Sequence, residues 1–140
     1  MGGNRGWWNQ SENTPAEKEA KYQWREVGQI DGVKVLENKK NKNAALPRFS
    51  NTPNTMYLHQ NSKGRIDQLR VFRGRNSFFD IDWGHGHGSI PRGVPHIQEW
   101  KYTPKTKTLT RVDNVRPMSP YMWKKYGPII MKADPTVRRK

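Results

Sequence analysis

The chain has 140 residues, of which 32% are hydrophobic, and it carries a formal net charge of +14. This length fits one domain of ordinary size with a modest core. The sequence has no cysteine, which excludes disulfide bonds and thiolate metal sites, and it has no apolar run long enough to span a membrane. The net charge is −1 over residues 1–20, +4 over 21–50, +2 over 51–100 and +9 over 101–140. Basic segments around a nearly neutral centre favour a polyanionic partner that is held by its phosphates.

The first predicted element is a helix over about residues 15–27. Thr14 can cap it, Pro15 suits its first position, and Glu17 completes a capping box. A short strand or turn is expected at Val33-Lys34-Val35-Leu36.

From residue 55 onward the pattern changes to β-structure, and turn signals separate the apolar segments. The sequence predicts an antiparallel meander of five strands: Thr55 to His59, Ile66 to Arg73, Ser77 to Trp83, His96 to Tyr102, and Leu109 to Val112. The last segment is rich in proline and glycine, so we expect no long helix there, only a turn or two over Tyr121 to Tyr126.

The densest group of chemically active side chains follows the third predicted strand. The segment from Phe79 to Gly88 holds Asp80, Asp82, His85 and His87, and His96 begins the next strand. Glycines between the histidines let backbone approach a substrate closely.

Strand periodicity decides which of these side chains share a face. Asp80 and Asp82 point to one side, and Phe79, Ile81 and Trp83 to the other, where they are expected in the core. On the next strand His96, Gln98 and Trp100 share a face. If the strands pair, an acid, an imidazole and an amide lie within hydrogen-bond reach.

This combination suits cleavage of RNA without a metal. A base takes the proton of the 2′-hydroxyl, an acid protonates the leaving 5′ oxygen, and a cation stabilises the phosphorane. We therefore predict a catalytic set of His85, His96, Asp82, His87 and Asp80. The predicted substrate-binding residues are Arg73, Arg75, Arg92, Gln98, Trp100 and Lys101.

Other interpretations of the histidines remain open. His85, His87, His96 and Asp82 are all of ligand types for a divalent ion, although their spacing matches no specific zinc pattern, and we predict neither a metal nor a cofactor. His87 suits solvent as well as a site, and His59 is expected to be an ordinary strand histidine.

Several short segments, in order and spacing, resemble the C-terminal nuclease toxin domains of bacterial polymorphic toxins and related phage head-associated domains. The segments are Leu46 to Ser50, Asn61 to Phe72, Asp80-Ile81-Asp82, His85-Gly86, and Pro95 to Trp100. The resemblance covers roughly 55 residues. It implies the barnase, EndoU, colicin and RelE type of α+β fold, in which an N-terminal helical segment packs on a four- or five-stranded antiparallel sheet. It also implies a ribonuclease site on Asp82, His85 and His96.

Two residues depart from the family pattern. Gln98 stands where the family commonly has a second strand histidine, and Phe72 replaces a tyrosine. His87 can make up for the lost histidine, or catalysis is absent and the domain only binds.

The expected protein is thus a metal-independent endoribonuclease, the toxin domain of a larger secreted bacterial protein that acts in the target-cell cytoplasm. We expect a flexible segment over residues 1–20, the nuclease domain over 21–130 and a basic tail over 131–140, all as a monomer. The expected partners are RNA and an acidic immunity protein that mimics its phosphates. RNA affinity is assigned mainly to residues 101–140, with Lys101, Lys105, Lys107 and Arg111 as contacts. The alternatives are a non-catalytic nucleic-acid-binding or phage structural module, and a metal-dependent DNase.

Overall fold

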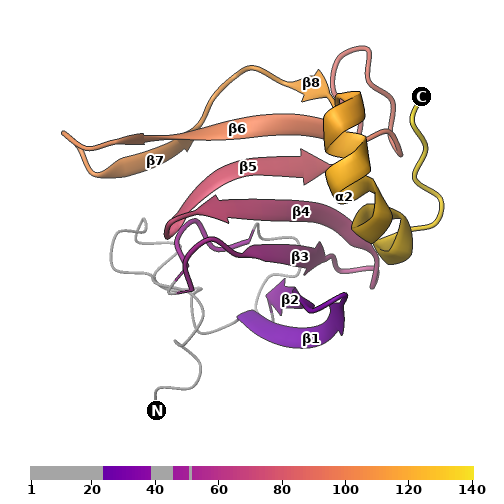
Figure 1. The fold of residues 1–140 in the computed structure, drawn as a ribbon, viewed down its shortest axis with the longest axis horizontal. Helices are drawn as coiled ribbons and strands as arrows, with labels where there is room; N and C mark the ends of the chain where they lie inside the picture. Colours follow the sequence, from indigo (N-terminus) through magenta and orange to yellow (C-terminus); the bar gives the residue numbers. More distant parts are fainter. Residues whose placement is uncertain (1–23, 39–45, 51) are drawn as a thin grey trace.

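A computed structural model describes residues 24–38, 46–50 and 52–140, and these form one large sheet with a single helix (Figure 1). The elements, in chain order, are β1 (Trp24–Ile30), β2 (Val33–Asn38), β3 (Met56–Gln60), β4 (Ile66–Arg73), β5 (Asn76–Asp82), β6 (His96–Thr103), β7 (Thr108–Arg111), β8 (Arg116–Pro117) and α2 (Pro120–Ala133).

The strands follow one another across the sheet in the order β1-β2-β3-β4-β5-β6-β7, and the short β8 pairs with β6. Neighbouring strands are antiparallel except for β2 and β3, which run parallel. A two-residue turn at Asp31 and Gly32, both with positive φ, closes the β1–β2 hairpin, as an Asp-Gly pair favours.

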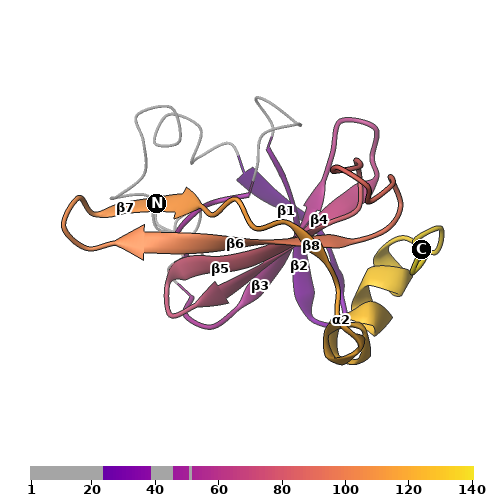
Figure 2. The same ribbon diagram turned by 90° about the horizontal axis from the view of Figure 1, so that it is seen from above.

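Helix α2 covers one face of the sheet near the end of β5 and the start of β6, and the rest of the sheet extends beyond it (Figures 1 and 2). Alternate residues of the central strands, Leu69, Phe79, Ile81 and Ile97, pack in one core cluster with apolar residues of α2. A second cluster is formed by Trp24, Leu36, Leu46, Tyr57 and Phe72. Since cross-strand partners share a face, Tyr57 and its partner Arg70 face away from the helix.

The predicted fold class is wrong in two respects. The described residues contain no N-terminal helical segment, because Trp24 to Val27, the end of the predicted helix, belong to strand β1; the rest of that prediction lies outside the described residues. The sheet also has eight strands and is mixed, where four or five antiparallel strands were expected. The five strands of the predicted meander are confirmed, each within two residues of its predicted ends.

The prediction of only a turn or two near the C-terminus is also wrong. Ser119 caps α2 by accepting a hydrogen bond from the Met122 amide, Pro120 takes its first position, and the helix continues through Pro128 to Ala133. A proline inside a helix costs about 3 kcal/mol. Burial of Ile129 and Ile130 against the sheet offsets this, since each large apolar side chain stabilises by about 1.5–3 kcal/mol.

The segment after residue 130 is part of the same packed unit. Val137 is buried in the core, and the Arg138 amide donates to the Gly93 carbonyl at 3.0 Å. The boundary predicted at residue 130 therefore falls inside α2.

Candidate functional site

Two rows of polar side chains cross the central strands on the face opposite α2. In one row Gln68 of β4 pairs with Asp82 of β5, which pairs with His96 of β6. In the neighbouring row Arg70, Asp80 and Gln98 are paired in the same way. The predicted pairing of the two aspartates with His96 and Gln98 is confirmed.

Asp80 accepts more hydrogen bonds than Asp82, the other carboxylate in these rows. Its Oδ1 accepts from Arg70 Nε at 2.6 Å, and its Oδ2 accepts from Arg70 Nη2 at 3.1 Å, Trp100 Nε1 at 3.0 Å and Arg111 Nη2 at 2.7 Å. The Arg70 and Asp80 side chains are both fully buried, and Arg70 Nη1 also donates to the Leu46 carbonyl. With its oxygens occupied in this way, Asp80 suits a positioning role better than proton transfer.

Asp82 is the carboxylate with an unusual proton affinity. Its Oδ2 accepts from Gln68 Nε2 and from Arg111 Nη2, both at 3.2 Å. Burial, together with the neighbouring charge of Asp80, raises the pKa of Asp82 from 3.8 to about 6, although Arg111 and His85 oppose the change.

His85 and His96 lie beside Asp82, and His87 lies next to His96. His85 Nδ1 lies 4.0 Å from Asp82 Oδ1, and the rings of His85 and His87 lie 5.0 Å and 5.7 Å from the His96 ring, between centroids. The His96 side chain is buried, and its Nδ1 has no hydrogen-bond partner among the described residues, whereas the His85 side chain is 58% exposed. Burial and the charges of His85, His87 and Arg111 lower the pKa of His96 to about 4, so its imidazole is neutral near pH 7.

Glycines allow the loop between β5 and β6 to pack closely enough to bring these histidines together. A Cβ on Gly84 would lie 2.7 Å from the Asp67 Cβ, and one on Gly86 would lie 3.0 Å from the Ile90 carbonyl oxygen. His87 and Ile90 exchange two backbone hydrogen bonds across the loop. Larger residues at either glycine would displace the loop from the sheet.

His59 extends the first polar row toward β3, where it pairs with Gln68. Its Nδ1 lies 2.7 Å from Asp67 Oδ1, and its buried Nε2 has no hydrogen-bond partner among the described residues. Asp67 in turn contributes to the raised pKa of Asp82. His59 is thus more than an ordinary strand histidine, because its contact with Asp67 borders the site.

The predicted substrate-binding residues are not all near this cluster. Gln98 lies in the second row and donates to the Val112 carbonyl at 3.3 Å, and Trp100 donates to Asp80. Arg73 and Lys101 line a pocket beside Trp100. Arg75 precedes β5 and Arg92 follows it, so these two residues lie apart from each other, beyond opposite ends of the strand.

Arg111, Gln68 and Arg70 contact the aspartates and were missed as site residues. Arg111 was expected to contribute only to RNA affinity, yet its guanidinium bridges Asp80 and Asp82. The signal for Gln68 and Arg70 was their period-two spacing on β4, which places both on the face of the aspartates once the β4–β5 register is known.

One side-chain atom from each of Asp82, His85 and His96 lies within 4.8 Å of the others. Carboxylate and imidazole groups at this separation offer ligand types for a divalent ion as well as proton-transfer groups. The arrangement therefore supports two kinds of chemistry.

No family model, curated protein or solved structure matches the chain. In the part of the chain that the structure describes, the helix is too short and too polar to cross a membrane.

Proposed function

We propose that this chain is a metal-independent endoribonuclease that acts as the toxin domain of a larger secreted bacterial protein. The observation that carries the proposal is the pair of imidazole rings of His85 and His96, 5.0 Å apart and next to the Asp82 carboxylate. Two imidazoles in different environments can act as base and acid in one reaction.

His96 is the proposed general base. Its lowered pKa keeps the ring neutral, so it can accept the proton of the 2′-hydroxyl as that oxygen attacks the phosphorus. A bound phosphate anion would offset the cationic charges of His85, His87 and Arg111, which raises the proton affinity of His96 when substrate is present.

His85 is the proposed general acid. Its exposed ring can reach the leaving 5′ oxygen and protonate it as the P–O5′ bond breaks, which leaves a 2′,3′-cyclic phosphate. The Asp82 carboxylate lies 4.0 Å from His85 Nδ1, on the side of the ring where it can orient the imidazole. Arg111 contacts both aspartates, at 2.7 Å and 3.2 Å, and it would stabilise the charge of the phosphorane.

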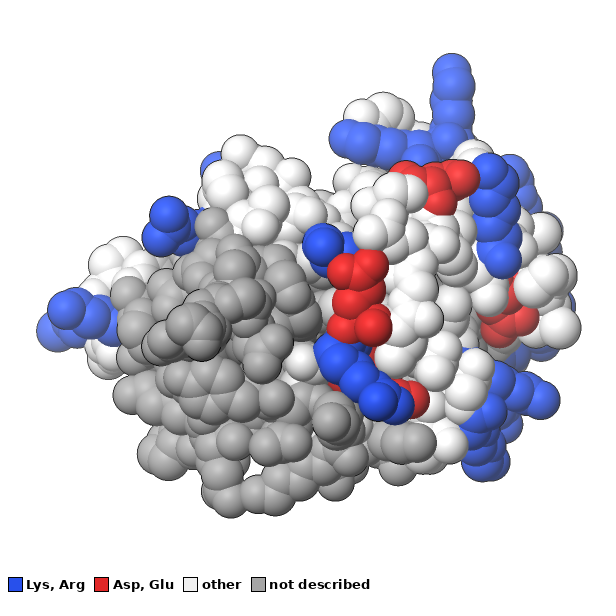
Figure 3. Space-filling model, turned by 90° about the horizontal axis from the view of Figure 1, so that it is seen from below, with Lys and Arg blue, Asp and Glu red and all other residues white. Residues whose placement is uncertain are grey.

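The charge of the molecule supports a polyanionic substrate. On the side shown in Figure 3, Lys and Arg side chains spread to the edges, whereas the few acidic ones lie beside basic ones. Two acidic residues of the β1–β2 hairpin are paired in this way, Glu26 with Lys34 at 3.0 Å and Glu37 with Arg25 at 2.9 Å. An inhibitor of such a surface, the proposed immunity protein, would be acidic.

The deciding experiment is cleavage of total RNA by the purified protein, with and without EDTA. Cleavage that survives EDTA, yields cyclic phosphate ends and is lost in His96→Ala is the expected result. Thermal unfolding of the variant shows whether it remains folded. Wild-type cleavage by folded His96→Ala would contradict the proposed base.

A metal-dependent nuclease is the second candidate, and the single observation in its favour is the close approach of Asp82, His85 and His96. Cleavage that stops in EDTA and returns with a divalent ion would select it, above all if DNA is also cut. RNA binding without any turnover would instead select the non-catalytic module.

A further inference from the structure

A pocket of about 300 Å³ lies on the same strands as the polar rows, toward the β6–β7 hairpin. Three aromatic and two basic residues contribute to it, and no acidic residue does. Its lining is Arg73, Asn76, Ser77, Phe78, Trp100, Lys101, Tyr102 and Leu109. Phe78 is 37% exposed, so part of its ring faces solvent.

The pocket lies at a defined distance from the catalytic row. Phe78 precedes Asp82 by four residues on β5, and Trp100 follows His96 by four residues on β6. At a rise of ~3.3 Å per residue, the two sites are about 13 Å apart along the strands. Period two places Trp100 on the face of His96. The alternation is interrupted at Phe78, because Val71 pairs with Phe79 but Phe72 pairs with Ser77; Phe78 lines the pocket where β5 is no longer paired with β6.

Trp100 is fixed in this position before anything binds. Its Nε1 donates to Asp80, and the guanidinium carbons of Arg70 and Arg48 lie 4.8 Å and 5.2 Å from the centre of its ring. The Arg73 guanidinium lies 5.0 Å from the Phe78 ring centre. An aromatic site that is already ordered loses little conformational entropy when a ligand enters.

We propose that this pocket binds a nucleobase of single-stranded RNA, from a nucleotide that flanks the scissile phosphate. The base would contact Phe78 and Trp100, and Arg73 and Lys101 would bind its phosphates. Aromatic rings between cations are the usual means of binding a single strand, since every base has a stacking face and every nucleotide carries negative charge. This inference rests on the proposed function, and it adds the substrate class: unpaired RNA that extends past the cleaved bond.

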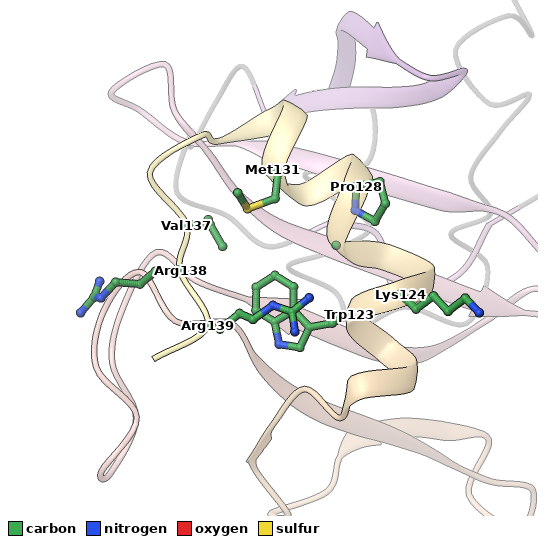
Figure 4. A pocket seen from close by; sticks show the side chains of 8 residues that line it. Trp123, Lys124, Pro128, Met131, Val137, Arg138 and Arg139 are labelled. Atoms are coloured by element: carbon green, nitrogen blue, oxygen red, sulfur yellow. The ribbon is translucent and has the colours of Figure 1, made fainter.

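The groove on α2 is larger, about 420 Å³, and it is also basic, but it is a poorer candidate (Figure 4). It lies over the helix, on the opposite face of the sheet from Asp82 and His96. Trp123, the aromatic residue of its lining, is buried, so the groove offers no exposed ring for a stacked base. Its residues therefore provide matched controls.

The first test measures binding of a fully 2′-O-methylated hexanucleotide, which has no 2′-hydroxyl to attack, by fluorescence anisotropy. Phe78→Ala is expected to weaken binding by about 5- to 150-fold, the range for loss of one stacked base. Met131→Ala, which removes a 43% exposed apolar side chain from the α2 groove, is expected to leave binding unchanged. Arg73→Gln is expected to reduce the salt slope by about one, and Lys124→Gln in the α2 groove to leave it unchanged.

The second test compares substrates of different length. Phe78→Ala should raise KM for an RNA hexanucleotide but not for a dinucleotide, because a dinucleotide cannot reach from the catalytic row to the pocket. A folded Phe78→Ala that binds the methylated hexanucleotide as wild type does would overturn the inference, as would an equal rise in KM for both lengths.

These outcomes distinguish a failure of the proposed base-binding pocket, here called the subsite, from a failure of the proposed function. If the wild type cleaves RNA and Phe78→Ala binds the hexanucleotide normally, the subsite is wrong but the proposed nuclease activity is retained. If the wild type binds but never cleaves, and Phe78→Ala loses binding, the subsite is correct on a binding module. If an acidic protein binds at this pocket and RNA does not, the proposed ligand is wrong.

Discussion

Replacing Asp82 by asparagine should stabilise the protein at neutral pH while it reduces RNA cleavage. Burial next to Asp80 raises the pKa of Asp82 from 3.8 to about 6, which means that the fold disfavours its ionised form. At 1.36 kcal/mol for each pH unit, the ionised carboxylate costs about 3 kcal/mol at pH 7.

Asparagine avoids this cost and keeps part of the hydrogen bonding. Its amide oxygen can still accept from Gln68 or Arg111, whose bonds to Asp82 Oδ2 are 3.2 Å long. The attraction of Arg111 for the ionised carboxylate is already included in the raised pKa, so it is not subtracted again. We expect a gain of up to about 3 kcal/mol at pH 7, and no gain below about pH 4, where Asp82 is protonated in both the folded and the unfolded chain.

The matched variant is Asp80→Asn, two residues away on the same strand. Asp80 compensates the charge of the buried Arg70, so its neutralisation should lower stability by about 3–5 kcal/mol. Urea unfolding at pH 7 and pH 4, followed by tryptophan fluorescence, measures both variants. If Asp82→Asn destabilises the protein at pH 7 as much as Asp80→Asn does, the reasoning about burial is wrong.

Three other variants test single steps of the argument. His96→Ala and His85→Ala should each reduce RNA cleavage by about a hundredfold or more, the usual loss for a general acid or base, and wild-type rates in either would remove that residue from the mechanism. Arg111→Gln should lower kcat more than it raises KM, because the proposed contact strengthens in the transition state; a change in KM alone would assign it to substrate binding. Pro128→Ala should raise the free energy of unfolding by about 1–3 kcal/mol without changing cleavage, since alanine restores a helical N–H; a lower melting temperature would contradict this account of α2.

The local sequence pattern predicted those parts of the fold that depend on interactions between residues close together in the chain. The period-two alternation of Asp80 and Asp82 with Phe79 and Ile81 assigned core and site faces correctly, and the turn residues delimited the strands. The sequence did not reveal that β2 joins the sheet in parallel with β3, because that pairing links segments separated by a connection and depends on burial of Leu36 and Val35 in tertiary contacts.

The helix and the site were also predicted incompletely, because they too depend on contacts between residues far apart in the chain. Proline and glycine after residue 120 weaken a helix locally, and only packing of Ile129 and Ile130 on the sheet overrides them. Arg111 lies 29 residues after Asp82, and only the β6–β7 hairpin, in which Arg111 pairs with Trp100, returns it to the aspartates. The histidine cluster was predictable because its members lie close together in the chain.

The two perturbed groups of the site should affect stability in opposite directions as the pH changes. Burial lowers the pKa of His96 from 6.5 to about 4, so between these pH values the unfolded chain binds the proton more readily and stability rises with pH. The raised pKa of Asp82 has the reverse effect between 3.8 and about 6, because there the folded chain binds the proton more readily. The two contributions, each about 3 kcal/mol when complete, nearly cancel in the wild type.

Removing one of the two groups should therefore reveal the pH dependence of stability that the other group contributes. Asp82→Asn should lose stability as the pH falls from about 6.5 to 4, and His96→Gln should gain stability over about pH 6 to 4, relative to the wild type. Urea unfolding at several pH values gives both slopes, and Lys105→Gln, an exposed change in the β6–β7 turn, serves as the control. Slopes equal to the wild-type slope in both site variants would mean that neither group is perturbed by burial. In that case His96 would not be held neutral by the fold, and its assignment as the base would lose its physical support.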